Sequence, residues 1–227
     1  MIKFVFLDLD DTILNFHKAE RIALSKTLRA FGAEPEEHLL HRYHLINKAH
    51  WEMLERGELT RQQVLVGRFD VLFRELGRPQ DPAAIARCYE ENLGIGHYFL
   101  PGALEAVKSL KEKYHLYLAS NGTASVQRSR LTSAGLYPYF DDIFISQEMG
   151  ADKPSRAYFD RCFERIPDFR PDQAVMVGDS LTSDMAGGRN AGLRTIWVNP
   201  DHLGCPDPGP DYEIESITQL EALLETL

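Results

Sequence analysis

Short apolar runs recur along the chain and predict the strands of a parallel sheet. They lie at residues 4–7, 116–119, 143–145, 175–177 and 196–198. Each run is too short for a helix and is rich in branched or aromatic residues, which is typical of strands that are buried on both faces. Stretches with helical spacing separate them, at residues 103–114, 125–134, 156–166 and 183–191. This alternation predicts an α/β fold with a doubly wound parallel sheet.

The segment after the first run breaks this alternation, because residues 16–96 contain no convincing strand. Apolar side chains recur there at steps of three or four residues, which indicates amphipathic helices, and Thr60 and Asp81 are predicted N-caps. We therefore expect two domains, an α/β core at residues 1–15 and 97–227 and a helical cap at residues 16–96. The two linkers between them would form a hinge.

Composition and charge narrow the class of protein. The 227 residues are 44% hydrophobic and 26% charged, and 34 acidic against 25 basic side chains give a formal net charge of −9. These proportions indicate a folded globule and exclude a disordered, collagen-like or disulfide-stapled chain. The acidity disfavours long nucleic acids and anionic membranes as partners. With no signal peptide and no run that could span a bilayer, we expect a cytoplasmic monomer or weak dimer.

Carboxylates follow two of the predicted strands. Asp8 and Asp10 follow the first run, and Asp179 follows the run at residues 175–177, with Asp184 five residues further on. The carboxyl ends of strands in a doubly wound sheet line one crevice, so these like charges should share a small volume. Oxygen ligands of this kind suit Mg²⁺. The sequence therefore predicts a magnesium site that contains Asp8, Asp10, Asp179 and Asp184.

A phosphate-binding site is predicted beside these carboxylates. Ser120 can donate its hydroxyl, Asn121 and Gly122 can offer backbone amides, and the helix that follows begins with its positive dipole end. Lys153 would add a positive charge. Each of these features alone is more often an ordinary turn or a solvated side chain. Their joint occurrence at successive strand ends is what indicates a functional site.

At these motifs the chain resembles the haloacid dehalogenase-like hydrolases. The resemblance rests on D-x-D-x-T at residues 8–12, the serine at Ser120, the lysine at Lys153 and G-D-x-x-x-x-D at residues 178–184, and it covers essentially the whole chain. It implies that residues 16–96 are a cap of that family's first type. It also implies a magnesium-dependent phosphatase acting on small phosphate esters.

The resemblance also implies individual roles. Asp8 would attack phosphorus and form an aspartyl-phosphate, and Asp10 would protonate the leaving oxygen and later activate water. Magnesium would be held by Asp8, the Asp10 carbonyl and Asp179, with Asp184 orienting a bound water. Ser120 and Lys153 would stabilise the transferred group. Dehalogenases of this superfamily lack an acid at the position of Asp10, so the chain favours phosphatase chemistry.

The substrate prediction depends on four residues of the predicted cap: Asn47, Trp51, Arg68 and Phe69. Their pattern resembles the subgroup that contains bacterial pyrimidine 5′-nucleotidases, which implies a nucleoside 5′-monophosphate as substrate. An aromatic ring could stack on a base, and Asn47 or Arg68 could bind its edge. The alternative is that Trp51 and Phe69 simply belong to the core.

Three other functions remain open from the sequence. A phosphatase or phosphomutase for sugar phosphates would share every core motif. A phospho-acceptor signalling module would combine similar acids, a hydroxyl and a lysine, although the chain is long for one. A binding protein that has lost activity is disfavoured by the intact motifs.

The four aspartates, Lys153 and one Mg²⁺ sum to a formal charge of −1. Without the metal the site would repel a phosphate dianion, so binding of the dianion requires Mg²⁺.

Overall fold

The computed structural model describes residues 1–205 and 207–227, and the chain divides into two compact units. The first, called the sheet unit below, comprises Met1–Phe16 and His97–Leu227. The second, the helical unit, is His17–Gly96. The helical unit is thus an insertion in the chain of the sheet unit.

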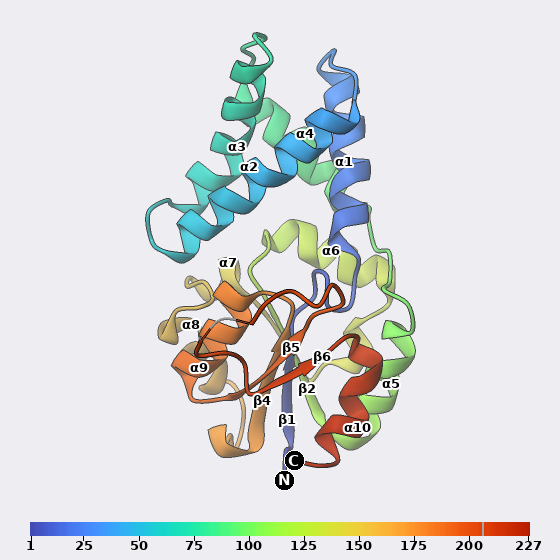
Figure 1. Cartoon of the computed structure of the whole chain (residues 1–227), viewed down its shortest axis with the longest axis vertical. Helices are drawn as coiled ribbons and strands as arrows, with labels where there is room; N and C mark the ends of the chain where they lie inside the picture. Colours follow the sequence, from blue (N-terminus) through green and yellow to red (C-terminus); the bar gives the residue numbers. More distant parts are fainter. Residues whose placement is uncertain (206) are drawn as a thin grey trace. The chain divides into compact units, whose positions relative to one another are not determined.

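A parallel sheet of six strands forms the centre of the sheet unit (Figure 1), in the order β3-β2-β1-β4-β5-β6. Each neighbouring pair of strands runs parallel, which confirms the predicted α/β fold class. The strands are β1 (Phe4–Leu7), β2 (His115–Ser120), β3 (Asp142–Ile145), β4 (Ala174–Gly178), β5 (Arg194–Val198) and β6 (Tyr212–Ile214). The first five coincide with the predicted apolar runs, whereas β6 is not predicted.

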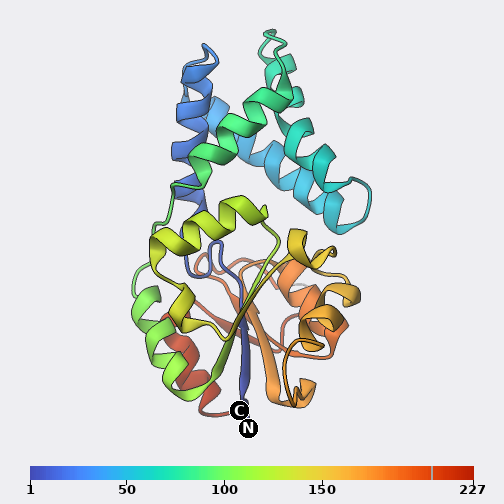
Figure 2. The ribbon, with the colours of Figure 1, turned by 180° about the vertical axis from the view of Figure 1, so that it is seen from behind.

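Helices cover both faces of this sheet because its strands are apolar on both sides. Val5 and Leu7 of β1 pack into the core that includes residues of α5 and α10, and Phe4 and Phe6 pack into the core that includes residues of α8. Figures 1 and 2 show α5 and α8 on opposite sides of the sheet. The helices are α5 (Ala103–Lys113), α6 (Ala124–Ala134), α7 (Ser146–Met149), α8 (Arg156–Phe163), α9 (Ala186–Ala191) and α10 (Leu220–Leu224).

The helical unit is built from four amphipathic helices. They are α1 (Phe16–Ala30), whose first residue belongs to the sheet unit, α2 (Glu37–Glu55), α3 (Arg61–Glu75) and α4 (Pro82–Leu93). Thr60 caps α3 by accepting from the backbone of Gln63, and Asp81 caps α4, as the sequence predicts. Across residues 1–205 and 207–227, no helix has the length and apolar character needed to cross a bilayer.

Candidate active site

The strand order brings the predicted site residues together at one edge of the sheet. Asp8 directly follows β1, Ser120 ends β2 and Asp179 directly follows β4. Strands β2 and β4 are the two neighbours of β1, and the backbone N–H of Asp8 donates to the carbonyl of Val177 at 2.9 Å. The carboxyl ends of three adjacent parallel strands therefore carry two carboxylates and a hydroxyl.

Lys153 lies among the carboxylates as their buried counter-charge. Its side chain is 1% exposed, and Nζ donates to Asp8 Oδ1 at 2.7 Å and to Asp184 Oδ1 at 2.6 Å. The third hydrogen bond goes to the carbonyl of Ala119, at 2.7 Å. An ammonium has three hydrogens, so these three acceptors fix its position. Although burial opposes the charge, the two aspartates raise the pKa of Lys153 above its ordinary value, and it stays protonated.

Asn121 holds the backbone of Lys153 in place. Its Nδ2 donates to the carbonyl of Lys153 at 2.9 Å, and its Oδ1 accepts from the N–H of Lys153 at 2.9 Å. This pair of bonds joins the turn after β2 to the segment after α7. The side chain of Asn121 thus positions the lysine, a function that the expected backbone role of this residue did not include.

Three carboxylates are close enough to share one cation. One oxygen each from Asp8, Asp179 and Asp184 lies within 4.8 Å of the others. Burial raises the pKa of Asp8 to about 8, although Lys153 lowers it. Burial, with Asp184 and Asp8 next, also raises the pKa of Asp179 well above its usual range. The single positive charge of Lys153 does not offset this set of acids, and a hard divalent cation with oxygen ligands fits them.

Both carboxylate oxygens of Asp184 accept hydrogen bonds from other groups of the protein. Oδ1 accepts from Lys153, and Oδ2 accepts from the backbone N–H of Ser180 at 3.1 Å. Gly178 makes this position possible, because a Cβ there would lie 2.1 Å from Asp184 Oδ2. These bonds suit a residue that holds a metal-bound water better than one that binds the metal directly.

Asp10 lies beside this set and is held by two residues that sequence reasoning missed. Its Oδ1 accepts from Arg130 at 2.5 Å, and its Oδ2 accepts from Nε2 of Gln127 at 2.7 Å. The same nitrogen donates to Ser120 Oγ at 2.8 Å. Gln127 and Arg130 come from α6 and are 1% and 0% exposed. The signal in the sequence is the scarcity of apolar residues in a helix that has to pack on the sheet.

The loop between β1 and α1 keeps Asp10 next to the strand end. Asp11 has φ of 53°, in the left-handed region that aspartate tolerates better than most residues. Its Oδ1 accepts from the backbone N–H of Phe16 at 2.8 Å, at the start of α1. Thr12 is fully buried in this loop. The chain therefore turns sharply after Asp10 before it enters the helical unit.

The predicted cap residues lie in the helical unit, and two of them form a buried polar chain. Arg68 donates to Asn47 Oδ1 at 2.7 Å, and Asn47 Nδ2 donates to Glu20 Oε1 at 2.8 Å. Phe69 is fully buried, with the rings of Tyr43 and Tyr89 each 5.2 Å away. Trp51 is partly exposed, and the guanidinium of Arg61 lies over its ring.

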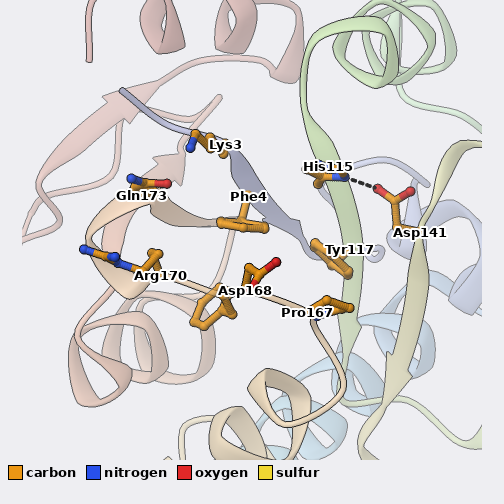
Figure 3. Close-up of a pocket in the computed structure, with 10 residues that line it drawn as sticks. Lys3, Phe4, His115, Tyr117, Asp141, Pro167, Asp168, Arg170 and Gln173 are labelled. Atoms are coloured by element: carbon orange, nitrogen blue, oxygen red, sulfur yellow. Dashed lines mark ion pairs between the residues drawn. The ribbon is translucent and has the colours of Figure 1, made fainter.

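A cavity of about 790 Å³ lies at the opposite, amino-terminal edge of the sheet. It is lined by Phe4 at the start of β1, His115 at the start of β2 and Gln173 just before β4. Figure 3 shows His115 turned toward Asp141, with Nδ1 of the imidazole 3.4 Å from Oδ2 of the carboxylate. Because Asp8 follows the other end of β1, this cavity is separate from the carboxylate site.

Comparison with known proteins agrees with this geometry. Residues 2–192 match the model of the haloacid dehalogenase-like hydrolase family. Pyrimidine 5′-nucleotidase PynA of Streptococcus pneumoniae is 37% identical over 220 residues, which are 96% of this chain and 93% of that protein. Pyrimidine 5′-nucleotidase YjjG of Escherichia coli is 30% identical over 224 residues, 97% of this chain and 96% of that protein.

A solved structure resembles the chain over almost its full length. The HAD-hydrolase YfnB of Bacillus subtilis, in a crystal form bound to magnesium, superposes with a TM-score of 0.94 at 37% identity and covers 98% of both chains. The family model spans well over half of the chain. This chain therefore belongs to the haloacid dehalogenase-like hydrolases.

Proposed function

We propose that this protein is a magnesium-dependent phosphatase that hydrolyses small phosphomonoesters through an aspartyl-phosphate, with pyrimidine nucleoside 5′-monophosphates as its substrates. The observation that carries the proposal is the buried grouping of Asp8, Lys153 and Asp184 at the end of β1, with Asp10 two residues from the nucleophile. The names of PynA and YjjG support the nucleotide as substrate.

The proposed first step uses the two aspartates that follow β1. The carboxylate of Asp8 attacks phosphorus in line, so that a bond from Asp8 oxygen to phosphorus forms as the bond to the ester oxygen breaks. Lys153 holds Oδ1 of Asp8, which orients the carboxylate for this attack. Asp10 in its protonated form gives its proton to the departing oxygen, and the alcohol leaves.

The second step restores the enzyme. Asp10 takes a proton from water, the water oxygen attacks phosphorus, and the bond between phosphorus and Asp8 breaks to release inorganic phosphate. In both steps Ser120 donates to the phosphoryl oxygens and the positive charge of Lys153 stabilises them, with the turn at Asn121 and Gly122 beside them. Asp8, Asp179 and the backbone carbonyl of Asp10 would hold Mg²⁺, and Asp184 would orient a water bound to it. The ion would neutralise charge on the nucleophile and on the phosphoryl oxygens.

The helical unit is proposed to act as a cap that selects the substrate. In this role Asn47 and Arg68 would recognise the edge of the base, and Trp51 would offer a stacking surface. Phe69 is buried, so it would not stack on the base. The guanidinium of Arg68 lies 5.2 Å from the centre of its ring. Phe69 would therefore keep Arg68 in position.

Replacing the nucleophile tests the chemistry. Asp8→Asn should abolish hydrolysis of p-nitrophenyl phosphate in the presence of Mg²⁺, whereas the exposed control Asp172→Asn should keep full activity. Near-full activity of Asp8→Asn would overturn the mechanism. The lifetime of the phosphorylated protein separates an enzyme from a signalling module, because a phospho-aspartate that survives for minutes would favour signalling.

The substrate is tested separately from the chemistry. Purified protein with Mg²⁺ would be assayed on UMP, dUMP, TMP and a set of sugar phosphates, and the pyrimidine nucleotides should have the highest kcat/KM. Asn47→Ala and Arg68→Ala should change this ranking without abolishing hydrolysis of p-nitrophenyl phosphate. An unchanged ranking in both variants would show that these residues do not select the substrate. If the wild-type protein preferred sugar phosphates, a sugar phosphate would replace the nucleotide as the proposed substrate.

A further inference from the structure

The side chain of Gln127 joins the hydroxyl of Ser120 to the carboxylate of Asp10. Its Nε2 donates to Ser120 Oγ at 2.8 Å and to Asp10 Oδ2 at 2.7 Å. Its Oε1 accepts from a guanidinium nitrogen of Arg130 at 2.9 Å. Because a guanidinium only donates, Arg130 determines which end of the amide carries oxygen. Both hydrogens of Nε2 are then committed, one to Ser120 and one to Asp10.

This arrangement decides what the Ser120 hydroxyl can do. Its oxygen accepts from Gln127 and also from the backbone N–H of Gly122, at 3.3 Å. A hydroxyl has two acceptor positions and one hydrogen. With both acceptor positions in use, the hydrogen has to be donated to a third group. Ser120 lies at the end of β2, next to the strand that leads to Asp8, so the phosphoryl group of the proposed substrate would be that third group.

Burial makes the protein, and not solvent, responsible for this geometry. Ser120 and Gln127 are each 1% exposed and Arg130 is fully buried. The close approach of α6 to the turn after β2 also needs glycine at position 122, because a Cβ there would lie 2.4 Å from Cγ of Gln127. Buried polar groups that are fully satisfied in this way hold one arrangement rigidly.

We infer that Gln127, oriented by Arg130, is a positioning residue that presents the Ser120 hydroxyl as a hydrogen-bond donor to the transferred phosphoryl group. The inference rests on the proposed phosphatase function, and it adds residues of α6 to the machinery of that reaction. Arg130 serves the same purpose from one step further away, because it binds Gln127 and the Asp10 carboxylate together.

Two substitutions of Gln127 test the inference through kcat and KM on p-nitrophenyl phosphate with saturating Mg²⁺. Gln127→Met keeps much of the side-chain length but removes both donors, and kcat should fall by about 100-fold, the usual cost of losing a donor to a developing anion. Gln127→Glu keeps the shape, but the new carboxylate would accept the Ser120 hydrogen and turn the hydroxyl away. Its kcat should fall further, while KM changes by less than about threefold in both variants.

A double-mutant cycle with Ser120→Ala distinguishes positioning from general support of the fold. Gln127→Met should lower kcat by a certain factor in the wild type and by a smaller factor in the Ser120→Ala background. If Gln127 acts through Ser120, the second factor should be at least about tenfold smaller than the first. The control is Arg128→Met on the same helix, whose exposed side chain pairs with Glu148 at 2.6 Å. Its kcat should match that of the wild type.

The inference is overturned if kcat of the Gln127 variants stays within twofold of the wild type, or if the two losses are fully additive. Thermal melts identify a variant that fails to fold, and the isosteric Gln127→Glu then carries the test in place of Gln127→Met. Failure of the proposed function is a different result, since the wild type itself would then hydrolyse no phosphate ester in the presence of Mg²⁺.

Discussion

Replacing Lys153 by methionine should lower the free energy of unfolding by about 3–5 kcal/mol when no divalent cation is present, the usual cost of removing one partner from a buried ion pair. The 1% exposed ammonium donates to Asp8 Oδ1 at 2.7 Å and to Asp184 Oδ1 at 2.6 Å. Methionine has a similar length and leaves no large cavity, so the loss comes from two buried carboxylates without a counter-charge. Part of this loss is avoided when the carboxyls take up protons, which the substitution favours because Lys153 lowers the pKa of Asp8, so the loss should grow as the pH is raised.

Lys111→Met is the matched control for this experiment. The ammonium of Lys111 pairs with Asp141 at 2.6 Å, but the two side chains are 29% and 33% exposed. An exposed pair contributes about 1 kcal/mol or less. The two variants therefore share the same substitution and nearly the same distance between the paired groups, and they differ in how deeply the pair is buried.

The assay is urea denaturation followed by circular dichroism, with EDTA and again with saturating Mg²⁺. Magnesium should reduce the loss in Lys153→Met, because a cation that binds only the folded state stabilises it and neutralises the same carboxylates. It should leave the Lys111→Met difference unchanged. If Lys153→Met lost no more than the control in EDTA, Lys153 would not be the counter-charge of these acids, and the electrostatic account of the site would be wrong.

Three further predictions follow from the same site. The pKa of Asp8 rises in the folded protein from 3.8 to about 8, so the folded state holds the extra proton. Stability measured in EDTA should therefore fall as pH rises from about 4 to about 8, and Asp8→Asn should reduce this dependence in urea titrations, with the remainder due to Asp179. Gly178→Ala places Cβ 2.1 Å from Asp184 Oδ2 and should weaken Mg²⁺ binding by about 10- to 100-fold, with Gly204→Ala, where a Cβ meets nothing within 4 Å, as the unaffected control. Inorganic phosphate should give a calorimetric binding signal only with Mg²⁺ present, and equal binding in EDTA would contradict the charge argument.

Much of the sheet unit could be predicted because its strands are visible in the sequence as short apolar runs. Runs such as Phe4–Leu7 and Ala174–Gly178 are buried on both faces and are apolar almost throughout. Parallel strands bring their carboxyl ends to one edge, so the meeting of Asp8, Ser120 and Asp179 follows from the strand assignment alone. Strand β6 escaped prediction because Tyr212–Ile214 is only three residues long and pairs with β5 alone.

The partners of Asp10 could not be predicted, for a different reason. Gln127 and Arg130 are polar residues on a helix, and such side chains usually face solvent. The group that justifies their burial lies 117 and 120 residues earlier in the chain. The polar character of α6 is visible in the sequence, but it does not identify a partner at that separation, which only the packing of α6 on the loop after β1 reveals. The same limit applies to Asn121, whose side chain binds the backbone of Lys153.

Arg130 also changes the charge balance of the site. The sequence offered four aspartates against Lys153, which with one Mg²⁺ left a negative site facing a phosphate dianion. In the structure the Arg130 guanidinium pairs with Asp10 at 2.5 Å, and its side chain is 0% exposed. This second cation makes the set of four aspartates, Lys153, Arg130 and one Mg²⁺ formally neutral. Without the metal the set is negative and repels the substrate. With the metal the repulsion is removed, and the donor hydroxyl of Ser120 and the positive charge of Lys153 can then favour the dianion.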